Sequence, residues 1–264
     1  ILEEGRERDP DFAWSLEEPG ELYIQDFNFY HSRDCVVLRG YPPNPGYRGI
    51  PLFTYLYHEY WLGYGGDMAP AVFSQQGRDY YAVYASYGIL KQGINLICGK
   101  FPAMGFLGTN SFDGLYADDL FPPFQTAMKG MAAIMRTRAL SYLTAGRMLH
   151  PLKLHVPRRA RIFWYGGRRR MDFPSVLNSV YESPDGNGVG YVFFNWTDKE
   201  VRFQVPLAPA TAKAAFYDIW RYGKGGSTAK PWKTRAALPQ KVNLTLAQGE
   251  SVFLEVVPYG ETFE

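Results

Sequence analysis

The sequence has few of the features that mark several large classes of protein. It contains only two cysteines, Cys35 and Cys98, which support neither a disulfide framework nor a metal site. Its formal net charge is +2, whereas nucleic-acid-binding domains usually carry a strong excess of basic residues. No apolar run approaches the roughly 20 residues that a membrane-spanning helix needs. We therefore expect neither a nucleic-acid nor a membrane partner, and no metal ion or other cofactor.

Common catalytic motifs are also missing. The chain has no glycine-rich loop of the phosphate-binding P-loop type, and no Gly-X-Ser-X-Gly turn that would present a nucleophilic serine. His58-Glu59 does not begin a zinc motif, because the fourth residue after His58 is Leu62 rather than a second histidine. The sequence therefore gives no support to serine-hydrolase chemistry or to a zinc site of this type.

Aromatic residues, in contrast, are abundant. Apolar residues make up 46% of the chain and aromatic residues 17%, with 20 tyrosines and 18 phenylalanines. Such a chain can bury a large core, and core packing explains most of these rings. Tyrosine and tryptophan rings also suit the C–H faces of sugars, so composition leaves both interpretations open.

The most informative cluster is acidic. Glu17, Glu18 and Glu21 follow the apolar segment Phe12–Leu16, which we expect to form a short buried strand ended by Pro19-Gly20. Barrel enzymes place their chemistry at the carboxyl ends of buried strands, and burial there raises a carboxyl pKa toward the value that a general acid requires. We therefore favour Glu17 as a residue directed into a site. The spacing is equally compatible with Glu17 as a loop residue and with Glu18 and Glu21 as solvated carboxylates at a helix amino terminus.

The first half of the sequence alternates apolar runs with helical patterns. We expect three short buried strands, at Phe12–Leu16, Ile50–Tyr57 and Ile94–Cys98. We expect helices near Glu21–Tyr30, over most of Met68–Leu90, and over about Phe124–Met148, where an apolar face is formed by Met128, Met131, Met135, Ala139 and Tyr142. Strand–helix units of this kind imply parallel strands joined by right-handed crossovers. Because three strands cannot close a barrel, residues 1–150 would form only its C-terminal portion.

Polar and aromatic residues follow the second expected strand. His58-Glu59 at the end of that strand would contact sugar hydroxyls or orient a partner group, because two carboxylate-bearing strand ends would converge on one face. The loop from Trp61 to Asp67 would form an aromatic wall with a charged tip. The alternatives are a satisfied polar cap at the rim of a barrel for His58-Glu59 and an ordinary glycine-rich turn for the loop.

The second half, residues 151–264, changes character. We expect antiparallel strands at Val176–Tyr181, Gly190–Trp196, Val201–Val205, Lys241–Leu246 and Ser251–Val257. Asp185-Gly186-Asn187-Gly188 predicts a hairpin turn between the first two strands. The arginine-rich stretch 158–170 is interpreted as a strand flanked by solvated arginines rather than as a phosphate-binding patch. Together these segments indicate an all-β domain, a β-sandwich of about 100 residues.

Several of these segments resemble a known group of proteins. Ser15–Glu21, and Pro51–Phe53 leading to Tyr57–Tyr60, resemble a glycoside-hydrolase-like family of bacterial proteins that is distantly similar to endo-α-N-acetylgalactosaminidases and other α-glycosidase barrels. Val189–Thr197 and Ser251–Val257 resemble the β-sandwich that follows such barrels. The resemblance implies a (β/α)8 TIM barrel with a retaining mechanism, in which one carboxylate attacks the anomeric carbon and a second acts as acid/base.

The residues and the resemblance together predict the C-terminal part of a glycoside hydrolase that cleaves oligo- or polysaccharides. Glu17 is the expected acid/base, and the nucleophile strand has no counterpart in this chain. The expected substrate-binding residues are Glu18, Glu21, His58, Glu59, Trp61 and Asp67. We also expect an N-terminal barrel segment of the same protein to complete the site, and a secreted or periplasmic location. The alternatives are a non-catalytic carbohydrate-binding protein and a subunit whose missing barrel half comes from a second chain.

Overall fold

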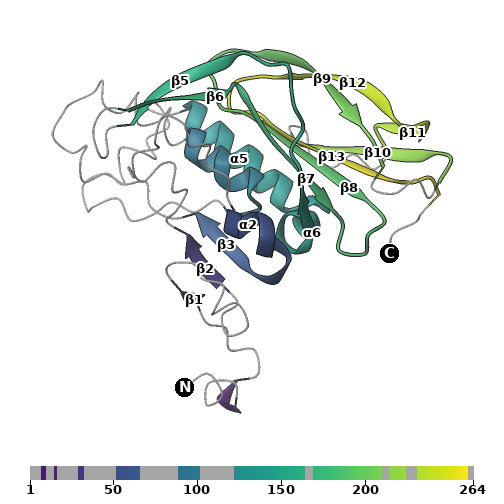
Figure 1. Ribbon diagram of the computed structural model, residues 1–264, viewed down its shortest axis with the longest axis horizontal. Coiled ribbons are helices and arrows are strands. Elements are labelled where there is room, and N and C mark those ends of the chain that lie inside the picture. Colours follow the sequence, from purple (N-terminus) through teal and green to yellow (C-terminus); the bar gives the residue numbers. More distant parts are fainter. Residues whose placement is uncertain are drawn as a thin grey trace.

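The structure is a computed structural model of the 264-residue protein. It describes residues 7–9, 15–16, 29–32, 52–65, 89–101, 122–163, 169–209, 214–223 and 231–260. Figure 1 shows short parallel strands toward one end of the molecule, helices in the middle and antiparallel sheets toward the other end. None of the helices in these ranges combines the length and the apolar composition needed to cross a membrane.

Three short strands form a parallel sheet in the order β1-β2-β3. They are β1 (Ser15–Leu16), β2 (Phe29–Ser32) and β3 (Leu62–Gly65). The N–H of Phe101 donates to the carbonyl of Gly63 at 2.8 Å, so the chain forms one further bridge beside β3. Three parallel strands agree with the sequence-based expectation, but only β1 lies where it is expected. The helix expected near Glu21–Tyr30 is wrong at its last residues, because Phe29 and Tyr30 belong to β2.

The two other segments expected as strands are helical, so both expectations are wrong. Leu52–Tyr57 forms α2, which runs directly into the 3-10 helix η2 (His58–Tyr60). Residues 89–97 are helical and end in a turn at Cys98 and Gly99. A short apolar run fits a helix as well as a strand, because it lacks the polar positions that would reveal the period. The helix expected over Met68–Leu90 is confirmed only at residues 89–90, since residues 68–88 lie outside the described ranges.

The long helix expected over Phe124–Met148 is instead two helices. They are α5 (Pro122–Met135) and α6 (Ala139–Ala145), and the strand β4 (Arg147–Leu149) follows them. The hydroxyl of Thr137 donates to the Ile134 carbonyl at 2.7 Å and accepts from the N–H of Ala139 at 3.2 Å, so it ends one helix and begins the next. The five residues of the expected apolar face are all buried or half-buried, which confirms the face in spite of the break.

The remaining strands are all antiparallel. The larger sheet has the order β11-β10-β13-β8-β7-β4, and two separate pairs are β12-β9 and β5-β6. The bounds are β5 (Arg158–Phe163), β6 (Arg169–Pro174), β7 (Val176–Glu182), β8 (Val189–Asn195), β9 (Val201–Leu207), β10 (Tyr217–Gly223), β11 (Lys233–Ala236), β12 (Gln240–Leu246) and β13 (Ser251–Pro258). All five antiparallel strands expected in the second half are therefore confirmed, at nearly the expected bounds. The division into domains at residue 150 and the barrel itself stay predictions.

The hairpin between β7 and β8 is confirmed in detail. Asp185 Oδ1 accepts hydrogen bonds from the Ser183 hydroxyl at 2.5 Å and from the N–H of Asn187 at 3.0 Å. Gly186 has a φ of +71°, which a glycine adopts without strain. These bonds close the turn and hold β7 and β8 in register from Val176↔Asn195 to Glu182↔Val189.

Burial explains why some strands were easier to locate than others. β8 and β13 are buried along almost their whole length, because the helices cover one face of the larger sheet and the β9-β12 pair covers the other. In β13, Phe253 faces the helical layer, whereas Leu254 faces β9 and β12. β9 alternates strictly between buried and exposed residues, since only one of its faces is covered. Its Val-Arg-Phe-Gln-Val sequence follows that alternation.

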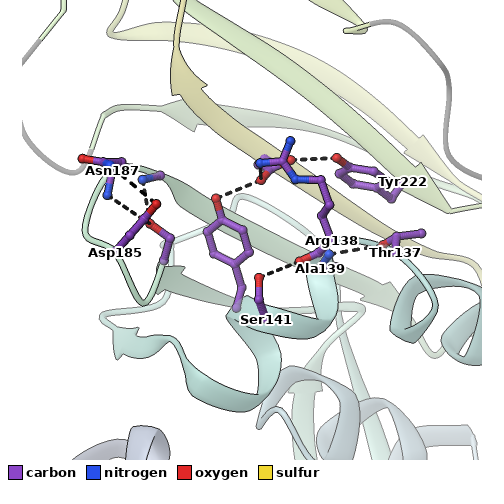
Figure 2. Close-up of polar contacts among 11 residues, drawn as sticks. Thr137, Arg138, Ala139, Ser141, Asp185, Asn187 and Tyr222 are labelled. Atoms are coloured by element: carbon purple, nitrogen blue, oxygen red, sulfur yellow. Dashed lines mark hydrogen bonds and ion pairs between the residues drawn. The ribbon is translucent and has the colours of Figure 1, made fainter. Parts of the chain in front are cut away.

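A buried carboxylate connects the helices to the larger sheet. Glu255 of β13 has no exposed surface, and its two oxygens accept hydrogen bonds from the hydroxyls of Tyr142 at 3.0 Å and Tyr222 at 2.7 Å. The guanidinium of Arg138, at the start of α6, lies 2.9 Å from the same carboxylate. Figure 2 shows Arg138 and Tyr222, which both contact this carboxylate. The cluster therefore joins α6, β10 and β13.

Candidate functional site

The carboxyl ends of the parallel strands define the candidate site. In the register of the sheet Leu16 pairs with Tyr30, and Tyr30 pairs with Gly63. Because the three strands run in one direction, their last residues, Leu16, Ser32 and Gly65, lie at the same edge of the sheet. In parallel α/β folds, ligands bind outside this edge. We call it the carboxyl edge.

Four of the seven predicted site residues lie outside the described ranges: Glu17, Glu18, Glu21 and Asp67. In the sequence, Glu17 directly follows Leu16 at the end of β1, and Asp67 comes two residues after Gly65 at the end of β3. Their roles stay predictions. Within the part of the chain that the structure describes, no three His, Cys, Asp or Glu side chains are grouped so that they could hold a metal ion.

His31 is a candidate at the carboxyl edge that the sequence analysis does not single out. It lies one residue from the end of β2 and pairs with Tyr64 in the register of the sheet. The sequence Phe-Asn-Phe-Tyr-His over residues 27–31 is rich in aromatic residues that favour strands, and this is the signal that locates it.

His58, Glu59 and Trp61 lie at the opposite edge of the parallel sheet, which corrects the expected convergence. They belong to η2 and to the residue that follows it, and the chain then enters β3 at Leu62. They therefore precede a parallel strand, whereas Glu17 follows one. The structure does not bring His58-Glu59 to the edge that Glu17 follows. Their proposed contacts with a sugar stay untested, and their surroundings favour other roles.

The side chain of His58 is packed into the interior. It is only 5% exposed, its Nδ1 lies 2.7 Å from the Gly146 carbonyl at the end of α6, and its ring lies 4.9 Å from the ring of Tyr181. Burial lowers its pKa from the ordinary 6.5 to about 4, and this outweighs the hydrogen bonds to the carbonyls of Gly146 and Leu143, which raise it. A neutral, buried and hydrogen-bonded imidazole of this kind joins η2 to α6.

Glycine at position 99 makes room for this imidazole. A Cβ at Gly99 would lie 2.1 Å from Nε2 of His58, and Gly99 has a φ of +68°, which favours glycine. The preceding helix, residues 89–97, is held to the larger sheet at the same place, because the Ile97 carbonyl accepts hydrogen bonds from Ser179 at 2.5 Å and Tyr181 at 2.6 Å. His58 is thus enclosed by α6, β7 and the end of the helix of residues 89–97.

Glu59 and Trp61 have different surroundings from His58. Glu59 is exposed, and its carboxylate raises the pKa of the neighbouring Tyr60 through a hydrogen bond to the phenol. Trp61 is only 6% exposed, and the ammonium of the buried Lys100 lies 5.9 Å from its ring centroid. Trp61 therefore contributes to the packing beneath β3, and of the three residues only Glu59 is accessible to a ligand.

The burial of His58 predicts that the protein loses stability in acid. Above the unfolded-state pKa of 6.5 the imidazole is neutral in both states, and as pH falls toward about 4 only the unfolded chain gains the proton. We expect the free energy of unfolding to fall by about 2–3 kcal/mol from this residue between about pH 7.5 and about pH 4.5. Urea unfolding at both pH values gives the change in the free energy of unfolding for the wild type and for His58→Gln. The difference between these two changes is the contribution of His58.

The matched control for His58→Gln is His155→Gln, because His155 is an exposed histidine in the segment between β4 and β5. We expect His155→Gln to keep the acid dependence of the wild type. Equal acid dependence in the wild type and in His58→Gln would contradict a buried, neutral His58.

Several solved structures to which the chain is similar at low sequence identity are glycoside hydrolases. They include a family 27 β-L-arabinopyranosidase from Geobacillus stearothermophilus (TM-score 0.43, 10% identity, 95% of this chain and 51% of that one). An Anoxybacillus α-amylase has a TM-score of 0.48 and 9% identity, over 99% of this chain and 56% of that one. A family 30 endoxylanase from Clostridium papyrosolvens has a TM-score of 0.37 and 10% identity, over 95% of this chain and 57% of that one. No protein-family model and no curated protein matches the sequence.

The distant similarity to glycoside hydrolases that the sequence indicates is thereby confirmed. The chain spans about half the length of these solved structures. We therefore treat the activity and the substrates of the whole protein as proposals.

Proposed function

We propose that the chain is part of a retaining glycoside hydrolase and that Glu17 is its acid/base. The observation that carries the proposal is the parallel register, Leu16↔Tyr30 and Tyr30↔Gly63, because it aligns the strand end that precedes Glu17 with the ends of β2 and β3. Enzymes built on parallel strands draw catalytic residues from several strand ends at one edge. Glu17 follows directly on such an end in the sequence.

Other residues have supporting roles in this proposal. Glu18, Glu21 and Asp67 are assigned to contacts with sugar hydroxyls near Glu17, and Asp67 is the acidic residue that follows β3. His31, near the end of β2, joins this group. A retaining mechanism also requires a nucleophilic carboxylate about 5–5.5 Å from the acid/base. We assign that nucleophile to a barrel strand outside this chain.

The stereochemistry of the product tests the proposal. We expect the complete protein to hydrolyse at least one member of a panel of unactivated α- and β-linked oligosaccharides. NMR spectra of the first product, recorded before it equilibrates, should show the anomeric configuration of the substrate, because two displacements retain it. An inverted product would rule out the retaining mechanism. Glycan binding without hydrolysis, unchanged in Glu17→Gln, would favour a carbohydrate-binding protein instead.

A further inference from the structure

Two exposed aromatic rings and an arginine form a cluster beside β10, β11 and β13 of the larger antiparallel sheet. Phe216, just before β10, is 41% exposed, and Tyr259, just after β13, is 49% exposed. The N–H of Tyr259 donates to the Phe216 carbonyl at 3.0 Å, which keeps the two residues side by side. The guanidinium carbon of Arg235 lies 5.2 Å from the Phe216 ring centroid and 5.5 Å from that of Tyr259. The cluster is remote in sequence from Glu17.

The backbone of Arg235 adopts a conformation that residues other than glycine rarely adopt. Among the described residues it is the only one other than glycine with a positive φ, at +51°. It lies in the edge strand β11, where the pairing with β10 shifts register between Tyr217 and Ile219. Such bulges at sheet edges redirect a side chain, and strain of this kind is found most often at functional sites.

Asp218 holds the strained backbone in place. Its Oδ1 accepts hydrogen bonds from the Thr234 hydroxyl at 2.7 Å and from the N–H of Arg235 at 3.2 Å. The carboxylate is thus bound to the backbone of Arg235 rather than to its guanidinium. These two hydrogen bonds therefore help to hold residue 235 in this conformation.

The guanidinium of Arg235 keeps its hydrogen-bond donors available. Within the described part of the chain its side chain forms no hydrogen bond and no ion pair, and its guanidinium lies near the rings of Phe216 and Tyr259. A guanidinium held beside two aromatic rings in this way still has its N–H donors available for a planar anion such as a carboxylate.

We propose that Arg235, Phe216 and Tyr259 form an accessory binding surface for a carboxylate-bearing sugar residue. The carboxylate of a uronic acid pairs with the guanidinium, and the C–H groups of its ring lie against the exposed surface of Phe216 and Tyr259. The choice of a saccharide over another carboxylate rests on the proposed glycosidase function. The surface is separate from the carboxyl edge, so it binds substrate chains without taking part in bond cleavage.

Titration calorimetry of the complete protein with three probes tests this surface: trigalacturonate, the neutral galactose trisaccharide and triglutamate. We expect trigalacturonate to bind and the other two to bind at least tenfold more weakly. Arg235→Lys keeps the charge but loses the planar fork, so it should weaken trigalacturonate binding by about tenfold. Phe216→Ala should weaken it as well. Arg202→Lys is the control, because Arg202 is exposed on β9 and should leave affinity unchanged.

Two further variants test the role of the Arg235 side chain and the independence of this surface from Glu17. Arg235→Gly relieves the positive φ, so we expect it to abolish binding without lowering the melting temperature. Glu17→Gln should leave the affinity for trigalacturonate unchanged, whatever its effect on hydrolysis. Equal binding of triglutamate would reveal a general anion site and overturn the proposal. It would also be overturned if trigalacturonate failed to bind, or if it bound equally well to Arg235→Lys.

Discussion

Replacing Glu17 by Gln in the complete protein is expected to lower turnover of an unactivated oligosaccharide by about 10²–10⁴-fold. Glutamine has nearly the same shape as glutamic acid but cannot donate a proton to the leaving oxygen. A sugar alkoxide leaves poorly without that proton, so the loss falls on the chemical step. We expect kcat to fall while the affinity for substrate changes little.

Substrates with good and with poor leaving groups show whether Glu17→Gln has lost protonation of the leaving oxygen. An aryl glycoside with a good leaving group needs little help from an acid when its glycosidic bond breaks, so Glu17→Gln should release the first equivalent of phenol almost as fast as the wild type, although hydrolysis of the glycosyl-enzyme then lacks its base. Glu18→Gln is the matched control, since it removes the adjacent carboxylate, and we expect it to cost less than about tenfold on both substrates. Near-normal turnover of the oligosaccharide by Glu17→Gln would contradict the assignment.

The antiparallel part of the fold was predictable because its sequence carries the pattern of its own burial. β9 alternates Val201, Phe203 and Val205 with polar residues, and the structure buries those three and exposes the residues between them. The Asp-Gly-Asn-Gly turn needs a residue with positive φ, and Gly186 supplies it. These signals are local, so they do not depend on contacts with distant parts of the chain.

The parallel part was harder, because its short apolar segments contain too few polar residues to show a period. The segment ending at Tyr57 and the one ending at Cys98 carry no polar face, and tertiary packing made both of them helical. The true strands β2 and β3 are only four residues long. Strands of that length have too few positions to establish a period.

This error also changed the candidate site. Once Ile50–Tyr57 is taken as a strand, His58-Glu59 stands at its carboxyl end and next to Glu17. The structure places the strand after these residues instead, at Leu62–Gly65, so the pair moves to the opposite edge and His58 becomes a packed residue. The assignment of Glu17 does not depend on that segment, and it stays a prediction because residue 17 lies outside the described ranges.

Replacing Glu255 by Leu is expected to destabilise the protein by about 3–5 kcal/mol, the usual consequence of breaking a buried charge cluster. Leucine leaves the hydroxyls of Tyr142 and Tyr222 without their acceptor in the interior. Each unsatisfied buried group costs about 1–3 kcal/mol. Burial and the charge of Glu255 hold the pKa of both tyrosines above the usual range, so both hydroxyls are protonated donors at neutral pH. Arg138 is 38% exposed and can turn toward water, which limits the total.

Glu182→Leu is the matched control for Glu255→Leu. Glu182 also lies in a strand of the larger sheet and also pairs with an arginine, Arg147, at 2.6 Å. The Arg147 side chain is 60% exposed, however, and a solvated pair of this kind contributes only about 0–1 kcal/mol. Denaturant unfolding of both variants measures the difference directly. Equal losses would mean that the Glu255 cluster is no more than another surface ion pair, whereas a much larger loss for Glu255→Leu would establish that this carboxylate joins the helical layer to the sheet.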